Sequence, residues 1–203
     1  MGKNTDTKFD VPRSTFELRM VAWEVTRSCN LACVHCRASA ERGPYPGELS
    51  KEECLRVIDE ISSFSKPVII LTGGEPLLRS DIFDLALYGT ERGLRMVMAT
   101  NGTLINDKTI EEMKASGIQR VSISLDGPNA EMHDAFRKVK GSFEGSLRGI
   151  EMLKKGGIEF QINTTVTQVN LRTVPDILRL AVRVQAVAHH IFLLVPTGRG
   201  KDL

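Results

Sequence analysis

A regular alternation of β-rich and helical segments limits the folds open to this chain more than any other feature. Helical patterns with recognisable ends separate six short β-rich runs. The runs are Val21–Thr26, Val68–Thr72, Met96–Thr100, Val121–Asp126, Phe160–Val166 and Ile191–Val195, with His189 and His190 at the start of the last strand. Repeated strand–helix–strand units form a parallel sheet with right-handed crossovers, either open or closed into a barrel.

Capping signals and glycines predict where the five intervening helices begin and end. In "SKEE" we expect Ser50 and Glu53 to form a capping box, followed by an apolar face of Cys54, Ile58 and Ile61. Two further helices are predicted from Ser80 to near Gly93 and from Asn106 to Gly117, and a longer one ends at Gly156–Gly157. The last predicted helix starts after Thr173, and its inward face consists of Ile177, Leu180, Ala181 and Val184.

Polar and apolar residues alternate along the fourth and fifth runs. In "VSISLD" Ser122, Ser124 and Asp126 share one face, and in "FQINTTV" Gln161, Asn163 and Thr165 do the same. A doubly wound sheet buries both faces of its central strands, and a tightly filled barrel places Val, Ile and Leu inside. We therefore predict an α/β fold, a partial (β/α)6 TIM-like barrel with a ligand in its lumen.

The length suits one domain, but the last strand lacks a partner helix. The chain has 203 residues and stops at "TGRGKDL", shortly after the sixth run. We expect residues 1–17 to be an N-terminal extension and residues 18–203 to be a core domain truncated after the sixth strand. The chain then reads as the front part of a longer protein.

Charge and the N-terminus argue for a cytoplasmic protein without a nucleic-acid or membrane partner. The net charge is only +2, and no apolar run reaches the length of a signal peptide core or a membrane span. Cytosolic thiols stay reduced, so clustered cysteines predict a metal site rather than disulfides.

Three of the four cysteines lie in "CNLACVHC", directly after the first strand. Cys29, Cys33 and Cys36 would leave one iron of an iron–sulfur cube open to an external ligand, since such a cube normally takes four cysteines. The alternative is a zinc knuckle with His35 or Cys54 as the fourth ligand. The cluster is favoured because His35 adjoins Cys36 and Cys54 belongs to a buried helix face.

Glycine-containing turns follow the next three strands. In "TGGEP" the glycines allow close approach to a ligand and Glu75 could anchor an amine, although a plain turn explains the motif equally well. "ATNG" and "SLDG" place further short polar side chains at the same rim.

A strand, then C-x3-C-x2-C, then G-G-E-P resembles the radical S-adenosylmethionine (SAM) superfamily over nearly the whole chain. The resemblance implies a six-stranded partial barrel in which Cys29, Cys33 and Cys36 hold a [4Fe-4S] cluster whose open iron binds SAM. It also implies cofactor contacts from His35, Gly73, Gly74, Glu75, Asn101, Ser124 and Asn163.

The stretches "WEVTRSCNLACVHCRASA", "SLDGPNAEMHDAFRKVKGSFEGSLRGI" and "LLVPTGRG" resemble the tetrapyrrole-modifying branch, in particular haem b synthases of the sirohaem-dependent haem pathway. That resemblance implies oxidative decarboxylation of two propionates of Fe-coproporphyrin III, with a ferredoxin or flavodoxin as electron donor. The chain departs from that pattern, since we expect it to lack the family's C-terminal auxiliary-cluster (SPASM-like) domain.

Substrate carboxylates favour guanidinium partners, which makes rim arginines candidates. They are Arg27, Arg37, Arg137 and Arg199, although for each of them a solvated surface position is the more common case. His189 and His190 are expected at the opposite rim, in a structural role. Two rival functions remain open: a radical SAM enzyme that modifies a peptide, and a non-enzymatic zinc or iron–sulfur module.

Overall fold

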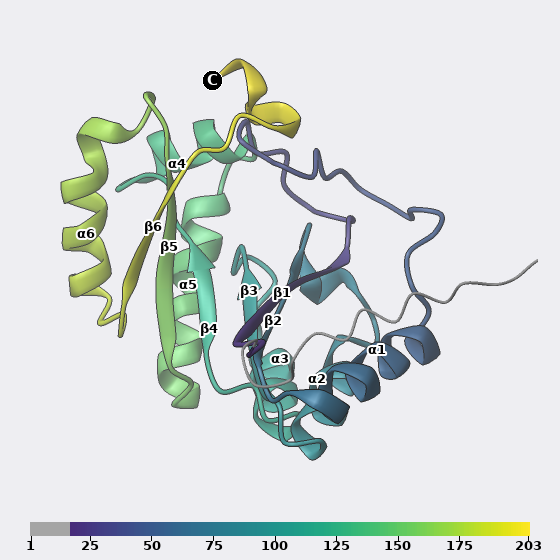
Figure 1. Cartoon of the computed structure of the whole chain (residues 1–203). Helices are drawn as coiled ribbons and strands as arrows, with labels where there is room; N and C mark the ends of the chain where they lie inside the picture. The colour runs from purple at the N-terminus through teal and green to yellow at the C-terminus, as the bar shows by residue number, and fades with distance from the viewer. Residues whose placement is uncertain (1–16) are drawn as a thin grey trace, which may run out of the picture.

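Six parallel strands pair in sequence order, β1-β2-β3-β4-β5-β6, in a computed structural model that describes residues 17–203. The strands are β1 (Met20–Thr26), β2 (Val68–Gly73), β3 (Arg95–Thr100), β4 (Val121–Ser124), β5 (Phe160–Val166) and β6 (His189–Leu193). Strands β1 and β6 are the two edges, so the curved sheet is an open, partial barrel as predicted (Figure 1). The predicted extension lies outside the described residues except for Glu17.

Helices cover the outer side of this sheet (Figure 1). They are α1 (Lys51–Phe64), α2 (Ile82–Glu91), α3 (Asp107–Ala115), α4 (Ala130–Arg137), α5 (Ser142–Gly156) and α6 (Val174–Arg183), with 3-10 turns η1 (Pro76–Leu78), η2 (Leu171–Thr173) and η3 (Gly198–Asp202). The capping box of Ser50 and Glu53 is present, and Asn106 caps α3 as predicted.

Two helix predictions were wrong in detail. Ser80 does not cap α2, because Asp81 occupies the N-cap position. The Asp81 carboxylate makes no cap hydrogen bond, since it accepts hydrogen bonds from Nε and Nη2 of Arg79 at 2.6 and 3.0 Å. The connection from β4 to β5 contains two helices rather than one. Lys138 adopts a left-handed conformation with φ of 59° at the end of α4 and separates it from α5.

Alternation along the strands sorts side chains between core and lumen. The outer, helix-facing core takes Met96 and Met98 of β3 and Val121 and Ile123 of β4, all fully buried. The opposite faces of β4 and β5 carry the predicted polar side chains. The lumen is therefore a polar-walled space, as the pattern indicated.

Strand β6 is the least covered part of the sheet. Leu193 is 78% exposed, and Ile191 and Phe192 are about half exposed. After β6 the chain turns into η3, which folds back over the segment between β1 and α1 (Figure 1).

Candidate active site

A cavity of about 410 Å³ opens at the carboxyl ends of the strands. Most of the predicted site residues line it together, although they come from distant segments of the chain. They are Cys29, Cys33, His35, Cys36, Arg37, Gly73, Gly74, Asn101, Ser124, Arg137 and Arg199. Of the other predicted residues, Glu75 and Asn163 do not line this cavity, and Arg27 lines a separate pocket.

The cysteines divide three to one. Cys29 and Cys33 are buried, Cys36 is half-buried, and all three thiols are free in one cavity. Burial raises the pKa of Cys29 to about 11, so without a metal this thiol keeps its proton at neutral pH. Cys54 lies on the inner face of α1 beside a different pocket, with its Sγ 3.9 Å from the Leu49 carbonyl oxygen. The cavity therefore offers three cysteine thiols as ligands, and Cys54 is not among them.

No three His, Cys, Asp or Glu side chains converge on a single-ion site anywhere in residues 17–203. Three thiols around one larger cavity fit the three-cysteine side of a cube of irons and sulfides. Arg137 also lines this cavity, and its guanidinium brings a positive charge to the wall beside the thiols, which suits an anionic group.

Backbone contacts from two distant segments hold the cysteine loop. The Ala32 and Val34 amides donate to the carbonyls of Arg137 and Phe136 at the end of α4, at 3.2 and 3.0 Å. From η3, Arg199 donates through Nε to the Cys33 carbonyl at 2.8 Å and through Nη1 to the Ala40 carbonyl at 2.8 Å.

Gly198 makes this approach possible. It has φ of +57°, and a Cβ there would lie 2.2 Å from the Arg37 carbonyl oxygen. The Arg199 amide also donates a 3.0 Å hydrogen bond to the Cys36 carbonyl. We call these three hydrogen bonds from Arg199 to the cysteine loop the Arg199 clamp. No local sequence signal identified the clamp, because its partners are more than 150 positions apart.

The G-G-E segment continues the β1–β2 pairing into the loop. The Gly74 amide donates to the Thr26 carbonyl at 2.7 Å and the Glu75 amide to the Ser28 carbonyl at 2.8 Å. A Cβ on Gly73 would lie 2.1 Å from the Thr26 oxygen. The glycines are thus needed for close approach of this chain's own backbone, and they also form part of the cavity wall.

The Glu75 side chain is fully buried behind that wall. Its carboxylate accepts hydrogen bonds from Thr100 Oγ1 at 2.6 Å, the Asn101 amide at 2.8 Å and the Leu77 amide at 3.1 Å. Burial raises the pKa of Glu75, while these donors favour its charged form.

An ion pair of Arg137 with Asp126 lies beside the cysteines. Arg137 Nη1 lies 3.5 Å from Cys33 Sγ, and Nη2 pairs with the Asp126 carboxylate. The His35 ring stacks on Phe136 with centroids 4.6 Å apart. Burial lowers the pKa of His35 to about 4, so this ring is neutral near pH 7.

The remaining predicted residues have partners of their own. Asn163 accepts from Gln161 Nε2 at 3.0 Å within the lumen, and Asn101 donates to Asn30 Oδ1 at 2.9 Å. Arg27 stacks over the Tyr45 ring at 4.8 Å.

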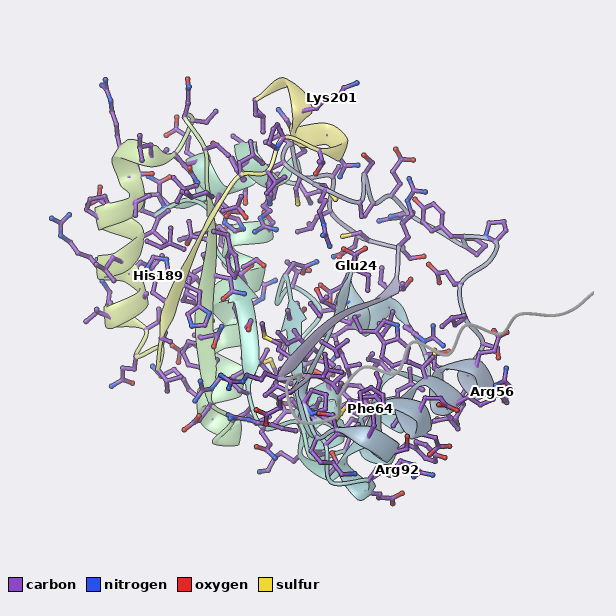
Figure 2. The ribbon with its side chains drawn as sticks, viewed as in Figure 1. Glu24, Arg56, Phe64, Arg92, His189 and Lys201 are labelled. Atoms are coloured by element: carbon purple, nitrogen blue, oxygen red, sulfur yellow. The ribbon has the colours of Figure 1, made fainter. Side chains whose placement is uncertain are left out.

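Arg37 lies at the cavity wall and pairs with Glu24 of β1. Figure 2 labels Glu24 on β1, near the carboxyl end of that strand, and His189 on β6, of which it is the first residue. His189 Nε2 lies 2.8 Å from Thr164 Oγ1, away from the cavity.

A parallel half-barrel with three cysteines at its carboxyl rim defines a class of radical enzymes. The family model described as the Radical SAM superfamily matches residues 23–181, and the chain belongs to this superfamily. The cofactors of the superfamily are a [4Fe-4S] cluster and SAM.

The chain is 58% identical over 185 residues to AdoMet-dependent heme synthase of Nitratidesulfovibrio vulgaris, covering 91% of this chain and 50% of that protein. It is 40% identical over 184 residues to Fe-coproporphyrin III synthase of Methanosarcina barkeri, covering 91% and 46%. The chain thus spans about half the length of these relatives.

A crystal structure of Streptococcus suis SuiB bound to S-adenosylmethionine matches with a TM-score of 0.73 at 17% identity, covering 89% of this chain and 41% of that one. This likeness supports the fold alone. In residues 17–203 no helix has the length and apolar character needed to cross a bilayer.

Proposed function

We propose that residues 18–203 form the radical SAM core of a cytoplasmic enzyme that decarboxylates tetrapyrrole propionates, converting Fe-coproporphyrin III to haem b. The observation that carries this proposal is one cavity lined by three free cysteines and the glycines of G-G-E-P, in a chain 58% identical to a heme synthase.

Cys29, Cys33 and Cys36 would hold the cluster, and the wall formed by Gly73 and Gly74 would meet the SAM amine. Asn101 and Ser124 line the same cavity and offer polar contacts to the rest of SAM. Glu75 would support this wall rather than contact SAM, because its buried carboxylate already accepts three hydrogen bonds from the protein.

Held by Cys29, Cys33 and Cys36, a reduced cluster with SAM would supply the radical chemistry needed to remove a hydrogen atom from the propionate carbon next to the ring. Each conversion of a propionate to a vinyl group would release carbon dioxide and pass one electron to an external electron acceptor. The protein has to hold the propionate at the cavity and keep water away from it.

Among the four predicted arginines, Arg37 is best placed to contact a propionate. Arg137 and Arg199 are engaged with protein groups, and Arg27 lines another pocket. Arg37 is largely exposed at the cavity wall, where a substrate carboxylate could replace Glu24 as its partner. The electron donor would be a ferredoxin or flavodoxin.

Isotope transfer tests this function. The chain, reconstituted without oxygen, is incubated with SAM, a chemical reductant and Fe-coproporphyrin III deuterated at the propionate carbons next to the ring. We expect deuterium in the 5′-deoxyadenosine by mass spectrometry, and no SAM cleavage by Cys33→Ala. SAM cleavage without deuterium transfer would show a radical SAM protein with another substrate.

A further inference from the structure

We propose that Arg137, held by Asp126, is a positioning residue that donates a hydrogen bond to the Cys33 sulfur and thereby raises the reduction potential of the cluster. This inference rests on the proposed cluster site. The sequence instead suggests a substrate contact for this arginine.

Asp126 is held rigidly at the end of β4. Its Oδ1 accepts from the Thr165 amide of β5 at 2.8 Å, and its backbone carbonyl accepts from Asn170 Nδ2 at 3.1 Å. Its own amide donates to His133 Nδ1 of α4 at 3.3 Å. The carboxylate is completely buried, so its position is set by two strands and one helix.

Arg137 is fixed between that carboxylate and the cysteine loop. Its side chain is only 8% exposed, its Nη2 pairs with Asp126, and its Nη1 lies 3.5 Å from Cys33 Sγ. Its carbonyl also accepts from the Ala32 amide within the loop. The Arg137 backbone therefore holds the cysteine loop, and its guanidinium contacts the Cys33 sulfur.

A plain structural ion pair does not explain this arrangement fully. Asp126 satisfies only part of the guanidinium, and Arg137 Nε has no partner although it is buried. Burying a charge is costly unless its donors are used. The contact of Nη1 with Cys33 Sγ and the position of Arg137 in the cavity wall fit an anionic group held by the three thiols.

The effect on the cluster follows from charge. Reduction takes one electron from an external reductant and adds one negative charge to a centre ligated by thiolates. Hydrogen bonds to ligand sulfurs and nearby positive charge favour the reduced state, and both act strongly where water is excluded. Arg137 supplies both a hydrogen bond to the Cys33 sulfur and a positive charge. The negative charge of Asp126 cancels part of that positive charge but leaves the hydrogen bond in place.

The test is the midpoint potential of the reconstituted full chain, measured by redox titration with electron paramagnetic resonance (EPR) detection. The main variant combines Arg137→Met with Asp126→Asn. It removes both charges together, and asparagine can still accept from the Thr165 amide. The matched control combines Arg179→Met with Asp176→Asn, which removes an exposed arginine–aspartate ion pair on α6 by the same two substitutions.

We expect the double variant to bind iron and sulfide like the parent and to show a more negative midpoint potential. The control pair on α6 should keep the parent midpoint. An unchanged midpoint would overturn the proposal, as would a folded double variant that binds no iron. If the double variant does not fold, Arg137→Lys decides: a more negative midpoint supports the proposal, and the parent value overturns it. Absence of a cluster in the parent would instead refute the proposed function.

Discussion

The amide of Asn101, at the end of β3, donates a 2.8 Å hydrogen bond to the carboxylate of Glu75, in the turn after β2. The hydroxyl of Thr100 donates to the same carboxylate at 2.6 Å. The glutamate of G-G-E-P thus joins two loops of the rim from inside the protein. It supports the cavity wall without forming part of it.

Replacing Glu75 by alanine should therefore lower fold stability. Three buried donors would lose a charged acceptor, and we expect the free energy of unfolding to fall by about 3 kcal/mol. Urea denaturation of the metal-free chain measures this. Glu111→Ala, an exposed glutamate on α3, should change stability by less than about 0.5 kcal/mol. Equal stabilities for both variants would contradict the buried role.

Replacing Cys29, Cys33 or Cys36 by alanine should abolish the cluster, whereas Cys54→Ala should keep it. The first three thiols share one cavity, and Cys54 lies beside another. Loss of the small buried Cys54 side chain should cost roughly 1 kcal/mol of stability. Iron and sulfide analysis after anaerobic reconstitution checks the assignment. Iron retained by Cys33→Ala but lost by Cys54→Ala would reverse it.

Gly198→Ala should loosen the cysteine loop in the metal-free protein. The added Cβ would lie 2.2 Å from the Arg37 carbonyl and displace the Arg199 clamp. If about 1.4 kcal/mol of local stability is lost, alkylation of Cys33 and Cys36 by iodoacetamide should be about tenfold faster. Mass spectrometry of the labelled peptides measures this rate.

Gly157→Ala is the matched control for the clamp. Gly157 also has a positive φ, of +70°, but a Cβ there would meet nothing within 4 Å. The backbone strain is therefore similar, and the clamp is untouched. Equal alkylation rates in the two variants would show that strain, and not the clamp, governs access to the thiols.

Stability should decrease as the pH falls below about 6.5, in part because of His133. Burial, and then the charge of Arg137, lowers the pKa of His133 to about 4, against opposing contributions from Asp126 and Asp134. The unfolded chain binds a proton that the folded chain excludes, so about 3 kcal/mol is lost between pH 6.5 and 4.

His133→Asn should reduce the slope of stability against pH by one proton in this window. Asparagine can still accept from the Asp126 amide, which His133 Nδ1 does at 3.3 Å. The lowered pKa of His35 leaves a second contribution in place. Denaturation of the metal-free variant at several pH values gives the slope, and a slope equal to that of the parent would contradict the assignment.

The six parallel strands, most helix ends and the polar lumen could be predicted from local patterns. The alternation of polar and apolar residues in β4 and β5 predicts which face of each strand packs against the helices. The capping signals at Ser50 and Asn106 involve residues within one helical turn. The cysteine spacing and the glycines after β2 likewise lie within single loops, so the sequence located most of the cavity wall.

The roles of the arginines could not be predicted in this way. Arg137 meets Cys33 across 104 positions, and Arg199 meets the same loop across 166. Such contacts depend on how the whole sheet curves and leave no periodic signal in the sequence. The Ser80 cap failed for a similar reason on a shorter scale, since Arg79 captured the neighbouring Asp81.

The central claim is that three cysteines of this chain hold a cluster with one iron open to SAM. The direct measurement is EPR of the anaerobically reconstituted, reduced chain before and after addition of SAM, with iron and sulfide determined on the same sample. We predict iron and sulfide in equal amounts and a [4Fe-4S] signal that changes on adding SAM. Bound zinc without sulfide, or a cluster signal indifferent to SAM, would contradict the account.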